Sequence, residues 1–338
     1  MMQTRAPSFP TWAKAVLVVV ICAAPLFADS QYILSIAVLT LLYAYLALSW
    51  NVLGGIAGQL SLGHAAYFGI GAYTSSWLFI KLGLTPWIGM WVGAAFAAVA
   101  ALIIGMSCLR LRGAYFALAT IAASMVIKVL VENADSLLGG PRGMEVTLLR
   151  DAPWQFQHTR KEFYYAVALV FVALAMYVNF RILGSRLGYY LAAVRNDQDA
   201  ALALGVRTTR YKLFAAAISA GMTALGGTFY AQFVLFISPE KVFGSHLSVV
   251  IAVLCIIGGR GTLWGPLLGA LLLLPGEEIA RAVSGGIVGV DMMLYGLILM
   301  IVIRWEPQGL MAIIERAWSR RSGGAPAAPG QPATEPTR

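Results

Sequence analysis

The stretch GQLSLGHAAYFGIGAY carries the side chains that could most readily do chemistry, because it places Gln59, Ser61 and His64 between Gly58 and Gly63 and a run of small and aromatic residues. A histidine near a serine could act as the base that activates a nucleophile. The same polar side chains could instead satisfy the backbone of an interrupted helix, which glycine favours. We interpret the stretch as a hydrogen-bonded helix break beside a membrane path, with Ser61 capping the helix that follows.

A catalytic or metal centre is disfavoured by the spacing of the remaining reactive residues. His158 and His246 lie far from His64, and neither HxxxH nor HExxH spacing occurs. Cysteines occur only within or at the edge of apolar segments and form no CxxC pair: Cys22, Cys108 and Cys255. We therefore expect no catalytic residue, no metal site and no enzymatic activity.

A second informative segment is 181–212, which contains the run DAALALG. Apolar residues recur there among charged and amide side chains, which predicts one or two short amphipathic helices ending at Gly205. A small-faced helix with charged ends suits docking in a groove of a soluble partner. A simple connection would be shorter and less patterned.

Polar side chains also occur inside otherwise apolar segments. Ser75, Thr120, Ser124 and Thr223 are the candidates for lining a path through the membrane. Packing between helices is the commoner use of such residues. In GIGA and GMTALGG, residues 69–72 and 221–227, small side chains predict close approach of helices.

The elements that carry these residues are membrane spans. Of 338 residues, 59% are hydrophobic and 12% are charged, whereas soluble domains average about 25% charged residues. Runs long enough to cross a bilayer predict an all-α integral membrane protein with about ten helices, some of them interrupted by glycine. The predicted spans are Trp12–Ala28, Tyr32–Leu53, Ala65–Leu82, Trp87–Leu109, Ala114–Val131, Phe163–Phe180, Leu213–Phe236, Leu247–Ile257, Trp264–Ala280 and Met292–Ile303.

Basic residues set the expected orientation. With the N-terminus inside, Lys and Arg favour the inner side two to one, as cytoplasmic loops require. This predicts a cytoplasmic N-terminus (1–11), a transmembrane domain (12–304) and a cytoplasmic tail (305–338) that is disordered from about 322. Segment 132–162 becomes an outer loop and 181–212 a cytoplasmic one. The basic residues lie between apolar runs and form no nucleic-acid patch.

The motifs together resemble the permease subunits of branched-chain amino acid ABC importers, in particular those of the M type. The resemblance covers nearly all of the chain from the second span to about Leu310. It rests on GQLSLGHAAYFGIGAYTSSWL, LRLRGAYFALATIA, DSLLGGPRGM, AAVRNDQDAALALGV, IGGRGTLWGPLLGA and PQGL, in this order. Tyr189 and Tyr190 stand where this family usually shows a basic residue, and Glu306 where Arg is commoner.

The resemblance implies an ABC importer permease fold that forms half of a translocation pathway in the inner membrane. It implies as partners a second homologous permease, two ABC ATPase subunits and an extracytoplasmic substrate-binding protein, besides membrane lipid. Arg195, Asp199, Ala200, Ala201 and Gly205 would belong to the ATPase-docking loop. ATP would be bound by the partners, since the chain has no G-x-x-x-x-G-K-[ST] loop and no cofactor of its own.

Three other functions remain open at this point. Permeases for urea or amides share much of this architecture. A passive channel would leave the docking loop unexplained, and a membrane enzyme would need acids and bases that lie on opposite sides of the bilayer. The near absence of acidic residues within the spans disfavours proton or sodium coupling.

Overall fold

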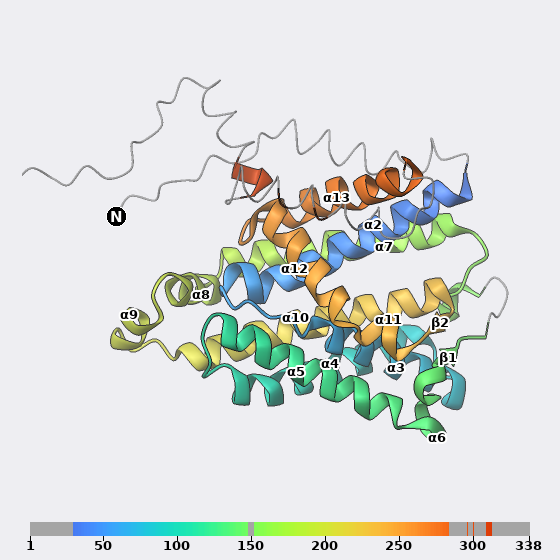
Figure 1. Cartoon of the computed structure of the whole chain (residues 1–338), viewed down its shortest axis with the longest axis horizontal. Helices are drawn as coiled ribbons and strands as arrows, with labels where there is room; N and C mark the ends of the chain where they lie inside the picture. Colours follow the sequence, from blue (N-terminus) through green and yellow to red (C-terminus); the bar gives the residue numbers. More distant parts are fainter. Residues whose placement is uncertain (1–29, 148–151, 284–295, 297–299, 301–308, 313–338) are drawn as a thin grey trace, which may run out of the picture.

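The computed structural model describes residues 30–147, 152–283, 296, 300 and 309–312, and within these it is a bundle of long helices (Figure 1). The expected first span, 12–28, lies outside the described residues, as does nearly all of 292–303 and of the C-terminal tail. The described helices are α2 Gln31–Trp50, η2 Asn51–Ile56, α3 His64–Leu82, α4 Pro86–Cys108, α5 Ala114–Glu132, α6 Asp135–Leu138, η3 Gly140–Arg142, η4 Pro153–Gln155, α7 Lys161–Leu183, α8 Arg186–Asn196, α9 Gln198–Ala203, α10 Thr208–Val234, α11 Pro239–Phe243, α12 Ser245–Gly259 and α13 Gly265–Val283.

Six candidate membrane spans occur among the described residues, by length and apolar composition. They are Gln31–Ile56, Pro86–Cys108, Ala114–Glu132, Lys161–Leu183, Thr208–Val234 and Pro239–Gly259. The expected eighth span, 247–257, is longer in the structure, because α11 and α12 together extend it back to Pro239. The chain is thus a multi-pass helical membrane protein.

Helix α3 lies at the centre of the bundle, packed between α4 and α10. It contains serines, tyrosines and a histidine and is not one of the six candidate spans, although it has 19 residues. Most of its side chains are buried within the protein. A helix shielded in this way needs no continuous apolar surface toward lipid, which explains its mixed composition.

Helices α3 and α10 approach each other closely at glycines, as GIGA and GMTALGG predict. A Cβ atom added to Gly71 would lie 2.0 Å from the carbonyl oxygen of Ala224, and one added to Gly227 would lie 1.9 Å from that of Phe68. The hydroxyl of Thr228 also donates a hydrogen bond of 3.1 Å to the Gly71 carbonyl oxygen. Small residues therefore set the distance between these two helices.

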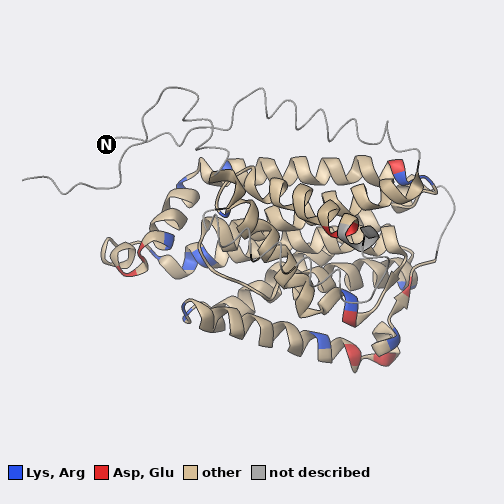
Figure 2. Cartoon of the chain, turned by 45° about the horizontal axis from the view of Figure 1, so that its top comes forward, with Lys and Arg blue, Asp and Glu red and all other residues tan. Residues whose placement is uncertain are grey.

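Charged residues gather toward the two ends of the bundle and are sparse along its middle (Figure 2). The end that carries α8 and α9 is strongly basic, with only Asp197 and Asp199 as acidic residues among those described. Its described basic residues are Arg110, Arg112, Arg181, Arg186, Arg195, Arg207, Arg210, Lys212 and Arg260. At the opposite end, acidic and basic residues are mixed; there Lys128 lies 3.8 Å from Glu132 and also contacts Glu240.

The mixed end is covered by the segment between α5 and α7. Strand β1, Met144–Glu145, pairs antiparallel with β2, Phe236–Ile237, with Met144 opposite Ile237. Phe156 is fully buried in a cluster of aromatic rings that includes Trp87 and Phe229. These contacts fix the segment to the ends of α4 and α10.

Candidate functional site

The first helix break follows η2, where the α2 helix passes into a π-helical turn and residues 57–63 are not helical. Side chains from distant helices satisfy its backbone: Thr120 accepts from the Leu62 amide at 3.1 Å, and Ser248 accepts from the Ala65 amide at 2.8 Å. The Trp50 indole donates to the Ser61 carbonyl oxygen at 2.7 Å. Irregular backbone at membrane depth is stable only with such partners.

The expectation that Ser61 caps α3 is wrong. The cap residue is Gly63, which makes no side-chain capping bond, and the Ser61 hydroxyl lies 3.5 Å from the Gly63 amide. At the start of α3 the Ala65 amide donates instead to the hydroxyl of Ser248 on α12, while Thr120 on α5 bonds the Leu62 amide just before the helix. A cap supplied by other helices leaves no local sequence pattern.

The second helix break separates α12 from α13, at residues 260–264, and it lies against the first. Asn51 joins them: its Oδ1 accepts from the Gly261 amide at 2.7 Å, and its Nδ2 donates to the Thr262 carbonyl oxygen at 2.9 Å. The same Nδ2 donates to Oδ1 of Asn179 at 3.1 Å, and Asn179 donates to the Leu48 carbonyl oxygen. Both asparagines are fully buried.

Sequence reasoning missed Asn51 and Asn179 as members of this site. The available signal was an amide side chain inside each of two apolar segments, where an unpaired polar group is costly. Their contact spans 128 positions of the chain, so the partner could not be deduced locally.

His64 is fully buried, and its Nε2 lies 2.8 Å from the Ser219 hydroxyl. Ser219 donates its own proton to the Ser49 carbonyl oxygen at 2.7 Å, so His64 Nε2 must be the donor toward Ser219. A histidine that donates to a serine cannot remove that serine's proton in this arrangement. Ser219 is also fully buried, and the pair therefore has the geometry of helix packing rather than of a nucleophile and its base.

The docking-loop segment folds as two short helices, α8 and α9, joined at Asp197, and extends to Gly205. Leu191, Val194 and Ala201 are buried against the bundle. Leu204 is 85% exposed and Leu202 is 47% exposed, so this segment presents an apolar tip to its surroundings. Ala200 is also exposed.

Asp199 is held by Arg112, which follows α4, through two hydrogen bonds of 2.7 and 2.8 Å. The pKa of the Asp199 carboxyl lies below its ordinary value, mainly because Arg112 donates hydrogen bonds to it and, to a smaller extent, because Arg112 is positively charged. The stability this pair contributes is therefore present above the ordinary aspartate pKa of about 3.9, and it is lost as the pH falls through the lowered value. The pair is fully formed at neutral pH.

The Arg195 side chain is exposed as a whole, but its guanidinium reaches the bundle. Its Nη1 donates a hydrogen bond of 3.0 Å to the Gly55 carbonyl oxygen, at the end of η2. Of the five docking-loop residues expected from the sequence, Arg195 reaches the helix breaks, Asp199 reaches the turn after α4, and Gly205 ends the loop with a φ of +81°.

The four path candidates are all buried in this chain. The hydroxyls of Ser75, Thr120 and Thr223 donate to carbonyl oxygens of their own helices, at 2.8 to 3.2 Å. The Ser124 hydroxyl has no hydrogen-bond partner within the described part of the chain. Their role as path lining remains a prediction.

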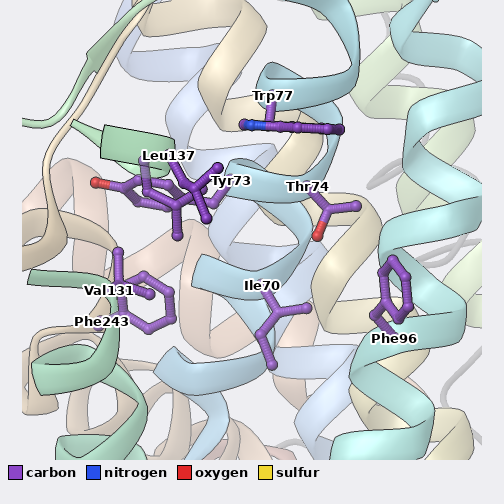
Figure 3. A pocket seen from close by; sticks show the side chains of 9 residues that line it. Ile70, Tyr73, Thr74, Trp77, Phe96, Val131, Leu137 and Phe243 are labelled. Carbon is purple, nitrogen blue, oxygen red and sulfur yellow. The ribbon is translucent and has the colours of Figure 1, made fainter. Parts of the chain in front are cut away.

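A cavity of about 320 Å³ lies beside α3, toward the mixed-charge end (Figure 3). Its lining is apolar apart from the Tyr73 and Thr74 hydroxyls and the Trp77 indole nitrogen: Ile70, Tyr73, Thr74, Trp77, Phe96, Val131, Leu137, Leu138 and Phe243. None of the four path candidates lines it. Across the ranges that the structure describes, no group of three or more His, Cys, Asp or Glu could hold a metal ion.

The structure thus combines a multi-pass helical bundle, two facing helix breaks and a helical loop that protrudes at the basic end, and the family match places it among membrane permeases. Residues 32–303 match the family described as "Branched-chain amino acid transport system / permease component", and the chain belongs to this family. It is a family of transport permeases and not of enzymes.

Two relatives illustrate the similarity. The high-affinity branched-chain amino acid transport system permease protein LivM of Escherichia coli K12 is 31% identical over 332 residues, which is 92% of this chain and 77% of LivM. The corresponding LivH of the same organism is 26% identical over 259 residues, covering 71% of this chain and 82% of LivH. No solved structure matches the chain significantly.

Proposed function

We propose that the chain is a permease subunit of an ATP-driven importer that moves branched-chain amino acids across the inner membrane. The family match over 32–303 carries this proposal, because it covers the helix breaks and the helical loop together. Similarity to both LivM and LivH supports a pathway formed by two homologous permeases, of which this chain is one. A binding protein outside the membrane would deliver the substrate.

The end with α8 and α9 would face the cytoplasm. Its excess of arginine over acidic residues supports this orientation, since positive charge is retained on the cytoplasmic side of short loops. Both termini would then be cytoplasmic, and the β1–β2 end would face the binding protein.

Two ATPase subunits would supply the energy, with one of them docking on the loop formed by α8, α9 and Gly205. The exposed Leu204 and Leu202 offer an apolar anchor of the kind that carries binding energy in helix-in-groove interfaces. Buried Leu191 and Val194 hold the loop to the bundle, so that a force on the tip reaches the membrane helices.

The path would run beside α3, where polar side chains are concentrated. Ser75, Thr120, Ser124 and Thr223 are sparse and mostly bonded to their own helices, which suits passage of an apolar solute that is not held tightly. Substrate choice would depend mainly on the binding protein.

The test is reconstitution of the chain in proteoliposomes with the second permease, the ATPase and the binding protein of its own organism. We expect leucine uptake that requires ATP, with urea transported far more slowly. Leucine uptake that is driven by a proton or sodium gradient without ATPase subunits would refute the proposal. Faster uptake of urea would retain the mechanism but reject the substrate.

A further inference from the structure

Several charged side chains join the docking loop to the rest of the bundle: Lys212 on α10 donates to Gln198 of α9, Arg112 bonds Asp199, and Arg195 on α8 reaches the first helix break. The Arg195 Nη1 donates to the Gly55 carbonyl oxygen at 3.0 Å. The carbonyl groups in the last turn of a helix lack intrahelical donors, and the helix dipole makes that end negative. A guanidinium is therefore a fitting cap for the end of the 26-residue span Gln31–Ile56.

The aliphatic part of Arg195 lies directly on Gly58. A Cβ atom added to Gly58 would lie 2.5 Å from Cγ of Arg195, and the φ of Gly58 is +70°. Both the close contact and the backbone conformation require glycine at this position. The first helix break is thus shaped around the arginine side chain.

The same guanidinium also contacts the second helix break. A Cβ atom added to Gly261 would lie 2.5 Å from Nη1 of Arg195, two residues beyond the last residue of α12. Asn51 also accepts a hydrogen bond from the Gly261 amide, so the second break is in contact with both Arg195 and Asn51. Helix α8 lies against η2 at this end of the bundle (Figure 1).

We infer that Arg195 is the positioning residue that couples the docking loop to the two helix breaks. The inference rests on the proposed function and assigns Arg195 to the inward side of the loop, not to the ATPase contact. When the ATPase displaces α8, Arg195 carries that displacement to the ends of α2–η2 and α12. Arginine suits this task because its guanidinium donates to the Gly55 carbonyl oxygen while its aliphatic part packs on Gly58.

The test compares Arg195→Ala with Arg186→Ala in the reconstituted four-component importer. Arg186 lies on the same helix, is exposed, and makes no hydrogen bond or ion pair among the described residues. We expect Arg195→Ala to retain ATPase binding and ATP hydrolysis but to move about tenfold less leucine per ATP, the effect of losing one charged hydrogen bond. Arg186→Ala should leave this ratio unchanged.

A double-mutant cycle with Gly58→Ala adds a readout that a purely structural role would not move. In the unmodified chain, Gly58→Ala pushes the Arg195 side chain aside and lowers leucine transported per ATP. In the Arg195→Ala background the Cγ atom is gone, so Gly58→Ala retains only the strain of its positive φ and should lower the ratio less than it does in the unmodified chain. Additive effects would overturn the inference.

Loss of ATPase binding in Arg195→Ala but not in Arg186→Ala would also overturn it, since Arg195 would then be an ATPase contact. An unchanged ratio of leucine to ATP in Arg195→Ala would overturn it as well. If the unmodified chain neither binds the ATPase nor supports uptake, the proposed function itself fails, and the inference fails with it.

Discussion

The close packing of α3 against α10 gives a sharp prediction for Gly227→Ala. The added Cβ would lie 1.9 Å from the Phe68 carbonyl oxygen, whereas real Cβ atoms stay at least 3.0 Å away. The two helices must therefore separate by about 1 Å, which overpacks one contact and stretches the Thr228 bond to Gly71. Together these effects should cost about 2–4 kcal/mol.

Gly221→Ala, on the same helix, is the matched control. Its Cβ would lie 3.7 Å from the Ala94 carbonyl oxygen, an ordinary contact, and alanine can stabilise a helix by up to about 1 kcal/mol. Measured by size-exclusion fluorescence after heating in detergent, Gly227→Ala should melt about 5–10 °C below the unmodified protein. Gly221→Ala should melt at or slightly above it. Equal melting temperatures for the two variants would refute the helix spacing described here.

Further predictions concern the polar contacts and the loop. Asn51→Leu should lower the free energy of unfolding by about 2–4 kcal/mol, because buried partners at the second break lose their hydrogen bonds. Thr40→Val removes only a hydrogen bond within its own helix and should change the free energy of unfolding little. Equal melting curves for the two would contradict this. Gly205→Pro should leave the chain inserted in the membrane but abolish co-purification of the ATPase. Proline cannot adopt a φ of +81°, and it lacks the amide that donates to the Leu202 carbonyl oxygen. Retained co-purification would reject the docking assignment. Arg112→Ala should raise the rate of amide hydrogen exchange in α9 by up to about fivefold, the size expected for the loss of an exposed ion pair. An unchanged exchange rate would show that Asp199 does not hold the loop.

Much of the architecture could be predicted from hydropathy and charge. Five of the six candidate spans begin and end within five residues of the predicted bounds, because a bilayer imposes a length of about 20 apolar residues on every crossing helix. Pro239–Gly259 begins eight residues before the predicted span, and the predicted spans 65–82 and 264–280 are not among the candidates. The two short helices of the loop followed equally from local pattern, ending at a glycine. Charge at the ends of the bundle reflected the distribution of arginine between the apolar runs.

The site was less predictable because its contacts are long-range. Ser61 was expected to cap α3 from its position in the sequence, yet the side-chain bond to the first turn of α3 comes from Ser248 on another helix. Asn51 and Asn179 bond across 128 positions, and a single sequence contains no record of that pairing. Arg195 was recognised as part of the loop, but only the structure shows that it faces the helix breaks.

The central claim is that an ATPase partner engages the basic end of this permease at the tip of the helical loop. The most direct measurement is photo-crosslinking from p-benzoylphenylalanine placed at Leu204, in the assembled importer, with Trp154 as the control. Trp154 is 88% exposed and lies at the opposite end of the bundle, beside the start of α4. We expect an ATPase adduct from position 204 and none from position 154. An ATPase adduct from 154, or its absence from 204 in an importer that transports leucine, would contradict docking of the ATPase at the tip of the loop.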